Sequence, residues 1–220
     1  MDYKKIVCVS ENTKKGFFEV YPEYNGIVET IYNYINGEYI LEKSKEKVED
    51  FDFTKGIWFV NMSRHVESTK HISYVIEAAR KLKEDNLDFN LLLIGDGESH
   101  NDYIELVKKY NLDNVHLVGG KSNPYKYLNH CNALILCSPF EGYGIVLDEA
   151  RVLGKTLIAP DVGDAKLMCK DGYGILCDNS VDGFYKGMKE YINKGYNSKK
   201  FDYIDFNKVI EDKALDLLRR

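Results

Sequence analysis

The chain has 220 residues and a formal net charge of −5, with 44% hydrophobic and 30% charged residues. This length accommodates one α/β domain with a buried core plus a fragment of a second, and the composition is that of an ordinary globular protein. The negative charge argues against general nucleic-acid binding, because a phosphate backbone is normally met by a basic surface.

The first 50 residues are predicted to hold a strand, a helix and a linker. A strand at Ile6–Ser10 precedes a helix from Thr13, and a second apolar segment follows at Ile27–Tyr32. The charged stretch Glu42–Lys47 resembles a linker. Because one strand and one helix cannot close a core alone, residues 1–50 are interpreted as the tail of an N-terminal domain followed by a linker.

From residue 57 onward, short apolar strands alternate with helical patterns, which is typical of βα units around a parallel sheet. The candidate strands are Ile57–Met62, Asn90–Ile94, Val115–Val118, Ala133–Cys137, Thr156–Ala159 and Gly174–Cys177. Apolar spacing predicts helices at Ser68–Asp85, Asp102–Tyr110, Gly144–Leu153, Val181–Asn193 and Asn207–Leu218. The expected fold class is therefore α/β, with a doubly wound, Rossmann-like parallel sheet of six strands in residues 51–200 and a C-terminal helix in residues 201–220.

Neither a membrane segment nor a metal site is predicted. No apolar run reaches the roughly 18 residues that span a bilayer, and the apolar strand after Met1–Lys5 is too short for a signal peptide. The five cysteines contain no C-x-x-C pair, and the five histidines lack H-x-x-x-H or H-E-x-x-H spacing. We therefore expect a cytoplasmic protein with free thiols and no metal.

Two cations follow the first strand of the predicted main sheet, where ligands of open α/β sheets bind. Arg64 lies just after the strand, and Lys70 lies near the start of the next helix. Both charges and the free N–H groups of a helix N-terminus would suit a diphosphate. The alternative is a solvated arginine and a surface lysine.

Two further strands end in glycine-containing loops. Gly95 and Gly97 allow either a sharp turn or a close approach of the backbone to a ligand. The loop Pro160–Asp164 is equally consistent with a plain turn and a binding loop. Neither loop alone indicates a site.

The segment Ser138–Ala150 carries the strongest signal. Gly142 and Gly144 open a helix whose first N–H groups could cradle phosphate or sugar oxygens. Glu141 lies in the loop and Glu149 lies about one and a half turns into the helix, so both can face one ligand. The alternative is an ordinary loop carboxylate together with an acidic residue favoured by the helix dipole.

Taken in order, these segments resemble the C-terminal domain of retaining family 4 GT-B glycosyltransferases over residues 55–180. The opening 40 residues resemble the end of that family's N-terminal domain. Glu141-Gly142-Tyr143-Gly144 through Glu149-Ala150 matches the family's E-G-[FY]-G…E-A signature. The segments Lys70–Ala78 and Leu93–Gly97 match two other family blocks in the expected order.

The resemblance implies a donor site for a UDP- or GDP-linked sugar, without any other cofactor. Catalytic roles would fall to Glu141, Arg64 and Lys70, with both cations on the diphosphate. Glu149 would bind the ribose hydroxyls. The remaining donor-binding residues would be Gly95, the helix start at Gly142, Tyr143, Gly144, Ile145 and Val146, and the nucleobase loop at Gly119, Lys121 and Ser122.

The implied reaction is metal-independent hexosyl transfer, with retention, to a glycan or a lipid-linked acceptor in polysaccharide biosynthesis. The acceptor would bind an N-terminal domain that is mostly missing, so we expect this chain alone to transfer little sugar. The complete enzyme would work in the cytoplasm or at the inner face of the membrane. Two departures from the family lie near the sugar: Met62-Ser63 stands where glycine usually precedes the arginine, and Gly163-Asp164 stands where two glycines are common.

Three other classes of protein are alternatives to a glycosyltransferase. A dinucleotide-dependent oxidoreductase would need G-x-G-x-x-G after a strand, and neither Ile6–Ser10 nor Ile57–Met62 is followed by that pattern. A non-catalytic nucleotide-sugar-binding module stays open, as does an isomerase or phosphorylase of the same architecture.

Overall fold

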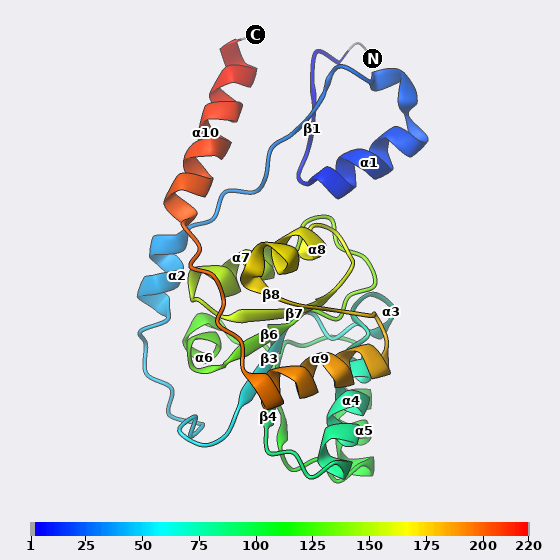
Figure 1. Ribbon diagram of the computed structural model, residues 1–220, viewed down its shortest axis with the longest axis vertical. Coiled ribbons are helices and arrows are strands. Elements are labelled where there is room, and N and C mark those ends of the chain that lie inside the picture. The colour runs from blue at the N-terminus through cyan, green and yellow to red at the C-terminus, as the bar shows by residue number, and fades with distance from the viewer. Residues whose placement is uncertain (1–2, 220) are drawn as a thin grey trace.

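The structure is a computed structural model that describes residues 3–219. It contains two parallel sheets, seen in Figure 1. The smaller sheet pairs β1 (Ile6–Cys8) with β2 (Val28–Thr30), and α1 (Glu11–Val20) and a 3-10 turn (Pro22–Tyr24) connect them. The main sheet is formed by β3 (Trp58–Met62), β4 (Asn90–Ile94), β5 (Val115–Leu117), β6 (Ala133–Ile135), β7 (Thr156–Pro160) and β8 (Gly174–Cys177).

The strand order of the main sheet is β5-β4-β3-β6-β7-β8, and every neighbouring pair is parallel. The chain thus moves outward from β3 to β5, returns to β6 on the other side of β3 and continues to β8. This reversal confirms the doubly wound α/β fold with six strands. Since β3 and β6 are adjacent, the carboxyl ends of these two strands mark the switch point where such sheets bind ligands.

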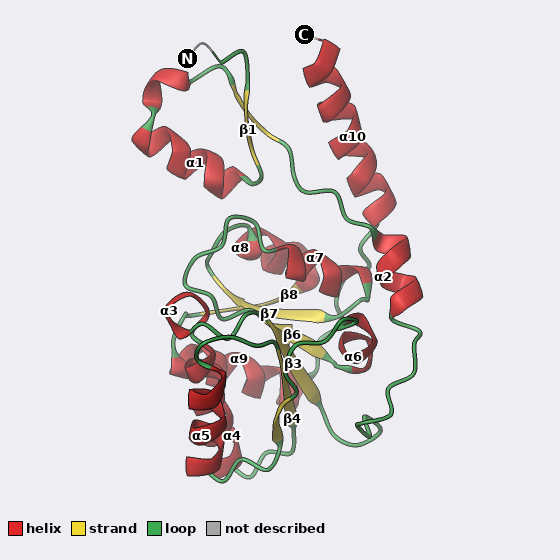
Figure 2. Ribbon diagram, turned by 180° about the vertical axis from the view of Figure 1, so that it is seen from behind, coloured by secondary structure: helices red, strands yellow, loops and turns green. Residues whose placement is uncertain are grey.

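Helices cover both faces of the main sheet, as the two opposite views in Figures 1 and 2 show. One face packs against α4 (Ile72–Glu84), α5 (His100–Lys109) and α9 (Val181–Lys194). The other face packs against α2 (Gly37–Lys43), α6 (Tyr125–His130), α7 (Ile145–Val152) and α8 (Ala165–Met168).

Alternating strand residues feed these two hydrophobic cores. Phe59, Leu91 and Leu93 belong to the core beneath α4, whereas Val60 and Leu92 belong to the core beneath α7. All five side chains are fully buried. Strands buried on both faces appear as nearly continuous apolar runs, which explains why the sequence located all six within two residues.

Several predicted helix boundaries were wrong. The predicted helix Ser68–Asp85 is two helices, α3 (Glu67–Lys70) and α4, because His71 has a left-handed backbone with φ of 45°. The charged stretch Glu42–Lys47, interpreted as a linker, begins inside α2. The C-terminal helix α10 (Tyr203–Arg219) starts four residues before the predicted Asn207.

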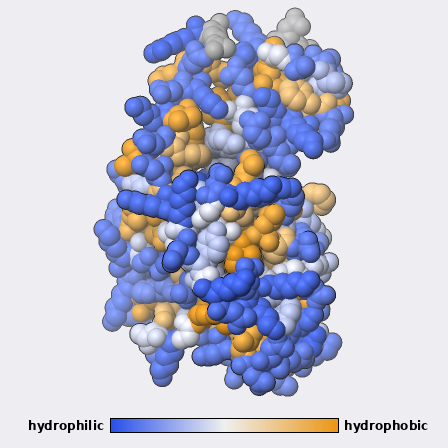
Figure 3. All heavy atoms as spheres, viewed as in Figure 1, coloured by the Kyte–Doolittle hydropathy of each residue, from blue (hydrophilic) through white to orange (hydrophobic). Residues whose placement is uncertain are grey.

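The N-terminal unit, defined as residues 3–30, lies with α10 beyond α7 and α8, on the same side of the main sheet (Figure 1). The face seen in Figure 3 is mostly hydrophilic, with apolar side chains gathered in narrow stretches between polar ones. Over residues 3–219, no helix combines the length and the apolar character needed to cross a bilayer.

Candidate functional site

Loops after β3, β4, β6 and β7 meet at the carboxyl ends of the central strands. A buried asparagine joins the two strands of the switch point: Asn61 in β3 donates from Nδ2 to the carbonyl of Ile135 in β6, at 2.9 Å. Ser63, just past β3, donates from its hydroxyl to Oδ1 of Asn61 at 2.8 Å. The backbone at this edge is therefore fixed by side chains as well as by the strand ladder.

The central feature of this edge is an ion pair between Lys70 and Glu141. Lys70 Nζ lies 2.6 Å from Glu141 Oε1 and 3.1 Å from the hydroxyl oxygen of Ser138. Both charged side chains are largely shielded, with 19% and 16% of their surface exposed. Lys70 was expected at a helix start, but it is the last residue of α3, where the break at His71 ends the helix. The sequence pattern thus named two residues that the fold brings together from 71 positions apart.

Arg64 lies in the loop after β3, and its side chain is exposed. Within the described part of the chain, no hydrogen bond or ion pair holds its guanidinium group. The structure therefore leaves Arg64 free at the rim of the site, whereas Lys70 is already anchored. An exposed, unanchored cation can turn toward an anionic ligand at little cost.

Glu149, the fifth residue of α7, contacts an aromatic residue that the sequence analysis did not single out. Its Oε1 accepts a hydrogen bond from the hydroxyl of Tyr125 at 3.0 Å. Burial raises the pKa of Glu149 above its usual value, and the hydrogen bond from Tyr125 partly opposes that shift. Burial, reinforced by the nearby carboxylate of Glu149, also raises the pKa of Tyr125. Tyr125 follows Pro124 as the first residue of α6, a helix that was not predicted from the sequence.

The helix start after Glu141 depends on one glycine. Gly144 precedes α7 with φ of 89°, a backbone conformation that favours glycine, and its carbonyl accepts from Leu147 N at 2.9 Å. Tyr143 is buried, and its hydroxyl donates to Asp148, so its side chain belongs to the core and does not face a ligand. Ile145 is exposed, and Val146 packs partly on the core. Free N–H groups of the first helical turn are thereby available to a ligand.

The glycines after β4 approach protein backbone closely. A Cβ on Gly95 would lie 1.8 Å from the carbonyl oxygen of Ser63, so no other residue fits there. Gly95 N also donates to the carbonyl of Gly119 at 3.0 Å. These contacts explain Gly95 as a junction between the loops after β3, β4 and β5, whether or not a ligand also touches it.

In the predicted nucleobase loop, Lys121 Nζ lies 3.6 Å from Asp50 Oδ2 and 5.4 Å from the centre of the Tyr127 ring. Ser122 is exposed. Gly119 takes φ of 68° and has open space where a side chain would lie. Of the three residues predicted here, Lys121 thus already has protein partners, and Gly119 and Ser122 are accessible.

The sequence patterns also gave no sign of a histidine pair next to the site. His65 is fully buried after β3, and its Nδ1 lies 2.7 Å from Nδ1 of His100 in α5, so one ring donates and the other accepts. Burial, reinforced by His100, lowers the pKa of His65 to about 4. The two histidines are 35 positions apart. No short motif could therefore have linked them.

Solved structures share this architecture. HepE from Anabaena, crystallised with UDP-glucose, gives a TM-score of 0.78 at 16% identity, over 97% of this chain and 64% of its own. Sucrose-phosphate synthase from Thermosynechococcus elongatus gives 0.79 at 18% identity, over 99% of this chain and 58% of its own. The fold is thus the one found in GT-B glycosyltransferases.

The family model described as "Glycosyl transferases group 1" matches residues 22–205. The chain belongs to this family. An uncharacterized glycosyltransferase of Methanocaldococcus jannaschii is 28% identical over 217 residues, which is 96% of this chain and 52% of the relative.

A second relative has a named activity. The Campylobacter jejuni N-acetylgalactosamine-N,N'-diacetylbacillosaminyl-diphospho-undecaprenol 4-alpha-N-acetylgalactosaminyltransferase is 28% identical over 180 residues, covering 78% of this chain and 47% of the relative. The chain spans about half the length of the curated relatives it matches.

Proposed function

We propose that the carboxyl edge of the main sheet binds the nucleotide-sugar donor of a retaining, metal-independent hexosyltransferase of family 4. The observation that carries this proposal is the shielded Lys70–Glu141 pair, 2.6 Å apart at the switch point and next to the start of α7. A cation and free helical N–H groups at one place suit a diphosphate. The E-G-Y-G…E-A motif, in which Glu149 is the second glutamate, supports the same assignment.

In this proposal the protein works by stabilising the leaving group. As the glycosidic bond breaks, negative charge grows on the diphosphate, and Lys70 and Arg64 stabilise it more in the transition state than in the ground state. Glu141 holds Lys70 in place and accepts from a sugar hydroxyl. Glu149 accepts from the ribose hydroxyls and thereby selects the nucleoside.

The donor is proposed to carry UDP or GDP, and the acceptor to be a glycan or a lipid-linked sugar. Support for a uridine nucleotide comes from the fold shared with HepE, a protein crystallised with UDP-glucose. Support for a lipid-linked acceptor comes from the name of the Campylobacter relative, which specifies a diphospho-undecaprenol-linked substrate. We interpret residues 51–200 as the donor-binding half of the enzyme, since the chain matches about half of each of these relatives.

The first test is a thermal-shift panel of UDP, GDP, ADP and their sugars. A ligand at 100 times its Kd stabilises a fold by about 2.7 kcal/mol, which is readily detected. We expect Lys70→Ala and Arg64→Ala each to weaken binding of the selected nucleoside diphosphate by about tenfold to a hundredfold, because each removes a charge-assisted contact.

Lys108→Ala is the matched control, because Lys108 is an exposed lysine of α5 outside the site. Calorimetry that found the same affinity in the Lys70, Arg64 and Lys108 variants would end the assignment of the diphosphate. Donor binding without hydrolysis or sugar transfer in the full-length protein would instead favour a non-catalytic binding module.

A further inference from the structure

The N-terminal unit holds the loop that carries Glu141. Thr13 in α1 donates from Oγ1 to the carbonyl oxygen of Gly142 at 2.8 Å, and Ser10 donates from Oγ to the same carbonyl. These hydroxyls lie 129 and 132 positions away from Gly142 in the sequence. A carbonyl oxygen has two lone pairs, so it can accept both hydrogen bonds at once.

The local structure of α1 explains why both hydroxyls point the same way. Ser10 is the N-cap of α1, with an extended backbone, and its hydroxyl accepts from Thr13 N at 2.9 Å. The two hydroxyl oxygens are also within hydrogen-bond distance of each other, at 2.8 Å, so their two protons serve three contacts, this one and the two with the carbonyl of Gly142. Ser10 is fully buried, so its one proton is directed at protein rather than at water. The cap of α1 and the contact with Gly142 therefore use the same atom.

The start of α1 also contacts the loop after β7. Asn12 N donates to Asp164 Oδ1 at 3.4 Å, and Asp164 is only 3% exposed. Next to it, a Cβ on Gly163 would lie 3.0 Å from the carbonyl oxygen of Glu141. The start of α1 thus touches both loops that flank Glu141, and those loops touch each other.

We propose that Ser10 and Thr13 are positioning residues for the sugar part of the donor. By fixing the carbonyl of Gly142, they keep the preceding carboxylate of Glu141 on Lys70 and the following helix start open to the ligand. This role rests on the proposed donor site. It makes the sugar subsite depend on the N-terminal unit, whereas the nucleoside subsite at Glu149 does not.

The test uses Thr13→Val and Ser10→Asp in the whole chain. Valine keeps the shape of threonine without a donor, and an ionised aspartate can still cap α1 but has no proton for Gly142. We expect each variant to raise the Kd for UDP-glucose by about threefold to tenfold, and the Kd for UDP by less than about twofold. Ser10→Thr, which keeps both functions of the hydroxyl, is expected to retain the affinity of the unchanged protein.

Thr54→Val is the control, because Thr54 is an exposed threonine that bonds only within its own turn. Overall loss of folding would weaken UDP and UDP-glucose together, so the ratio of the two Kd values reports positioning. An unchanged ratio in both Thr13→Val and Ser10→Asp would overturn the proposal.

A second readout needs no ligand. Amide hydrogen exchange over residues 142–147 is expected to accelerate in Thr13→Val, while exchange in α9 stays as in the unchanged protein. If neither nucleotide bound the unchanged chain, the proposed donor site would fail, and the exchange data would still decide whether the contact on Gly142 restrains the loop. Unchanged exchange over residues 142–147 would show that it does not.

Discussion

The carboxylate of Glu149 accepts a hydrogen bond from a hydroxyl group of the protein itself. Tyr125 donates to its Oε1 at 3.0 Å, and the ring of Tyr125 meets the edge of Tyr39 from α2 at 6.1 Å. This arrangement leaves Oε2 available for the ribose hydroxyls in the proposed site. It also favours the ionised carboxylate, whose pKa burial otherwise raises.

Tyr125→Phe separates these effects, because phenylalanine keeps the ring and removes the donor. Without the hydrogen bond, the pKa of Glu149 rises further, so the carboxylate takes up a proton at a higher pH than in the unchanged protein. Since the ionised form accepts from ribose, UDP affinity should fall as the pH drops, and this fall should begin at a higher pH in Tyr125→Phe. At low pH we expect UDP to bind about threefold to tenfold more weakly to Tyr125→Phe than to the unchanged protein.

The measurement is the Kd of UDP by calorimetry as the pH is lowered stepwise from neutral into the acidic range, toward the ordinary pKa of a carboxyl group. Tyr110→Phe serves as the control, since the ring of Tyr110 lies near Arg80 and Lys109, away from Glu149. Parallel pH profiles for Tyr125→Phe and the unchanged protein would contradict a role for Tyr125 in orienting Glu149.

Among the elements, the break between α3 and α4 bears directly on the site, because the last residue of α3 contacts Glu141. His71 has φ of 45°, a left-handed conformation that non-glycine residues seldom adopt, and its ring contacts that of Tyr74 at 4.8 Å. The break ends α3 at Lys70, whose ammonium group reaches Glu141. A continuous helix through residue 71 would give α3, and with it Lys70, a different orientation relative to α4.

His71→Gly and His71→Ala test how much strain this break contains. Both variants lose the ring contact with Tyr74, so their difference isolates the backbone. A left-handed conformation costs a residue with a Cβ roughly 1–2 kcal/mol, partly offset by the greater freedom of glycine in the unfolded chain. We expect His71→Gly to be about 1 kcal/mol more stable than His71→Ala in urea unfolding.

Lys186 in α9 provides the opposite control, because it is an exposed residue in the middle of a regular helix. We expect Lys186→Gly to be about 1 kcal/mol less stable than Lys186→Ala, because glycine is a poor helix former. If His71→Gly were also less stable than His71→Ala, the left-handed conformation of His71 would be contradicted.

The same elements show what the sequence could predict and what it could not. The six strands were predicted because buried apolar runs such as Leu91–Leu93 leave a strong local pattern. Helices α6 and α8 have six and four residues, too few for a helical period to emerge. Within the site, the motif named Glu141 and Glu149. It could not name Ser10, which bonds the carbonyl of Gly142 from 132 positions away, or Tyr125, which bonds Glu149 from 24 positions away, because both contacts depend on the completed fold.

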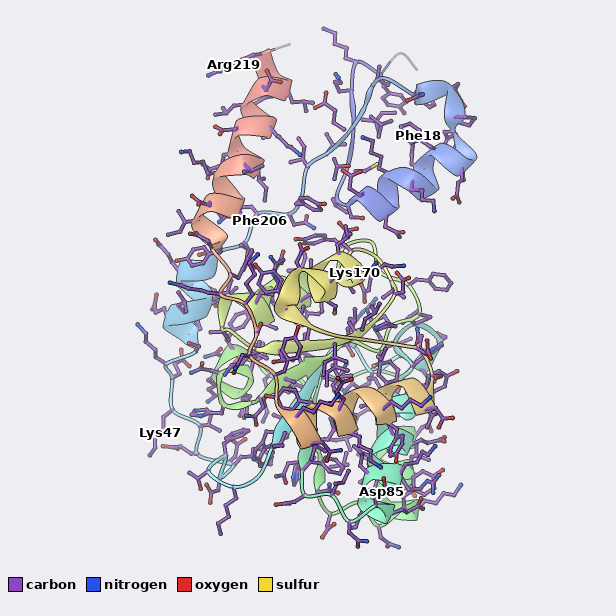
Figure 4. All side chains as sticks on the ribbon, viewed as in Figure 1. Phe18, Lys47, Asp85, Lys170, Phe206 and Arg219 are labelled. Atoms are coloured by element: carbon purple, nitrogen blue, oxygen red, sulfur yellow. The ribbon has the colours of Figure 1, made fainter. Side chains whose placement is uncertain are left out.

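The C-terminal helix α10 packs against the segment that leads from the N-terminal unit to the main sheet. Asn207 accepts from Ile35 N at 3.0 Å and donates to Ile35 O at 2.8 Å, and both residues are buried. Phe206, labelled in Figure 4 at the base of α10, packs against Tyr32 with ring centroids 5.9 Å apart. Lys213, two turns further along α10, donates to the carbonyl of Thr30 at 3.3 Å.

The N–H of Ile35 depends on this side chain, and Asn207→Ala would leave it buried without that partner, whereas the carbonyl of Ile35 would keep its hydrogen bond from Gly37 N at 2.9 Å. An unsatisfied buried polar group costs about 1–3 kcal/mol, so we expect a loss of about 1–3 kcal/mol in the free energy of unfolding. The loss should be local, with faster amide exchange over residues 31–36 and α10 and unchanged protection in β3, since Phe59 of β3 packs into the core beneath α4, to which neither segment contributes. Lys208→Ala, at the exposed neighbouring position of α10, should change neither quantity. Exchange that accelerated equally in β3 and in α10 would mean that the junction and the main sheet unfold as one unit, and the separate role of Asn207 would be lost.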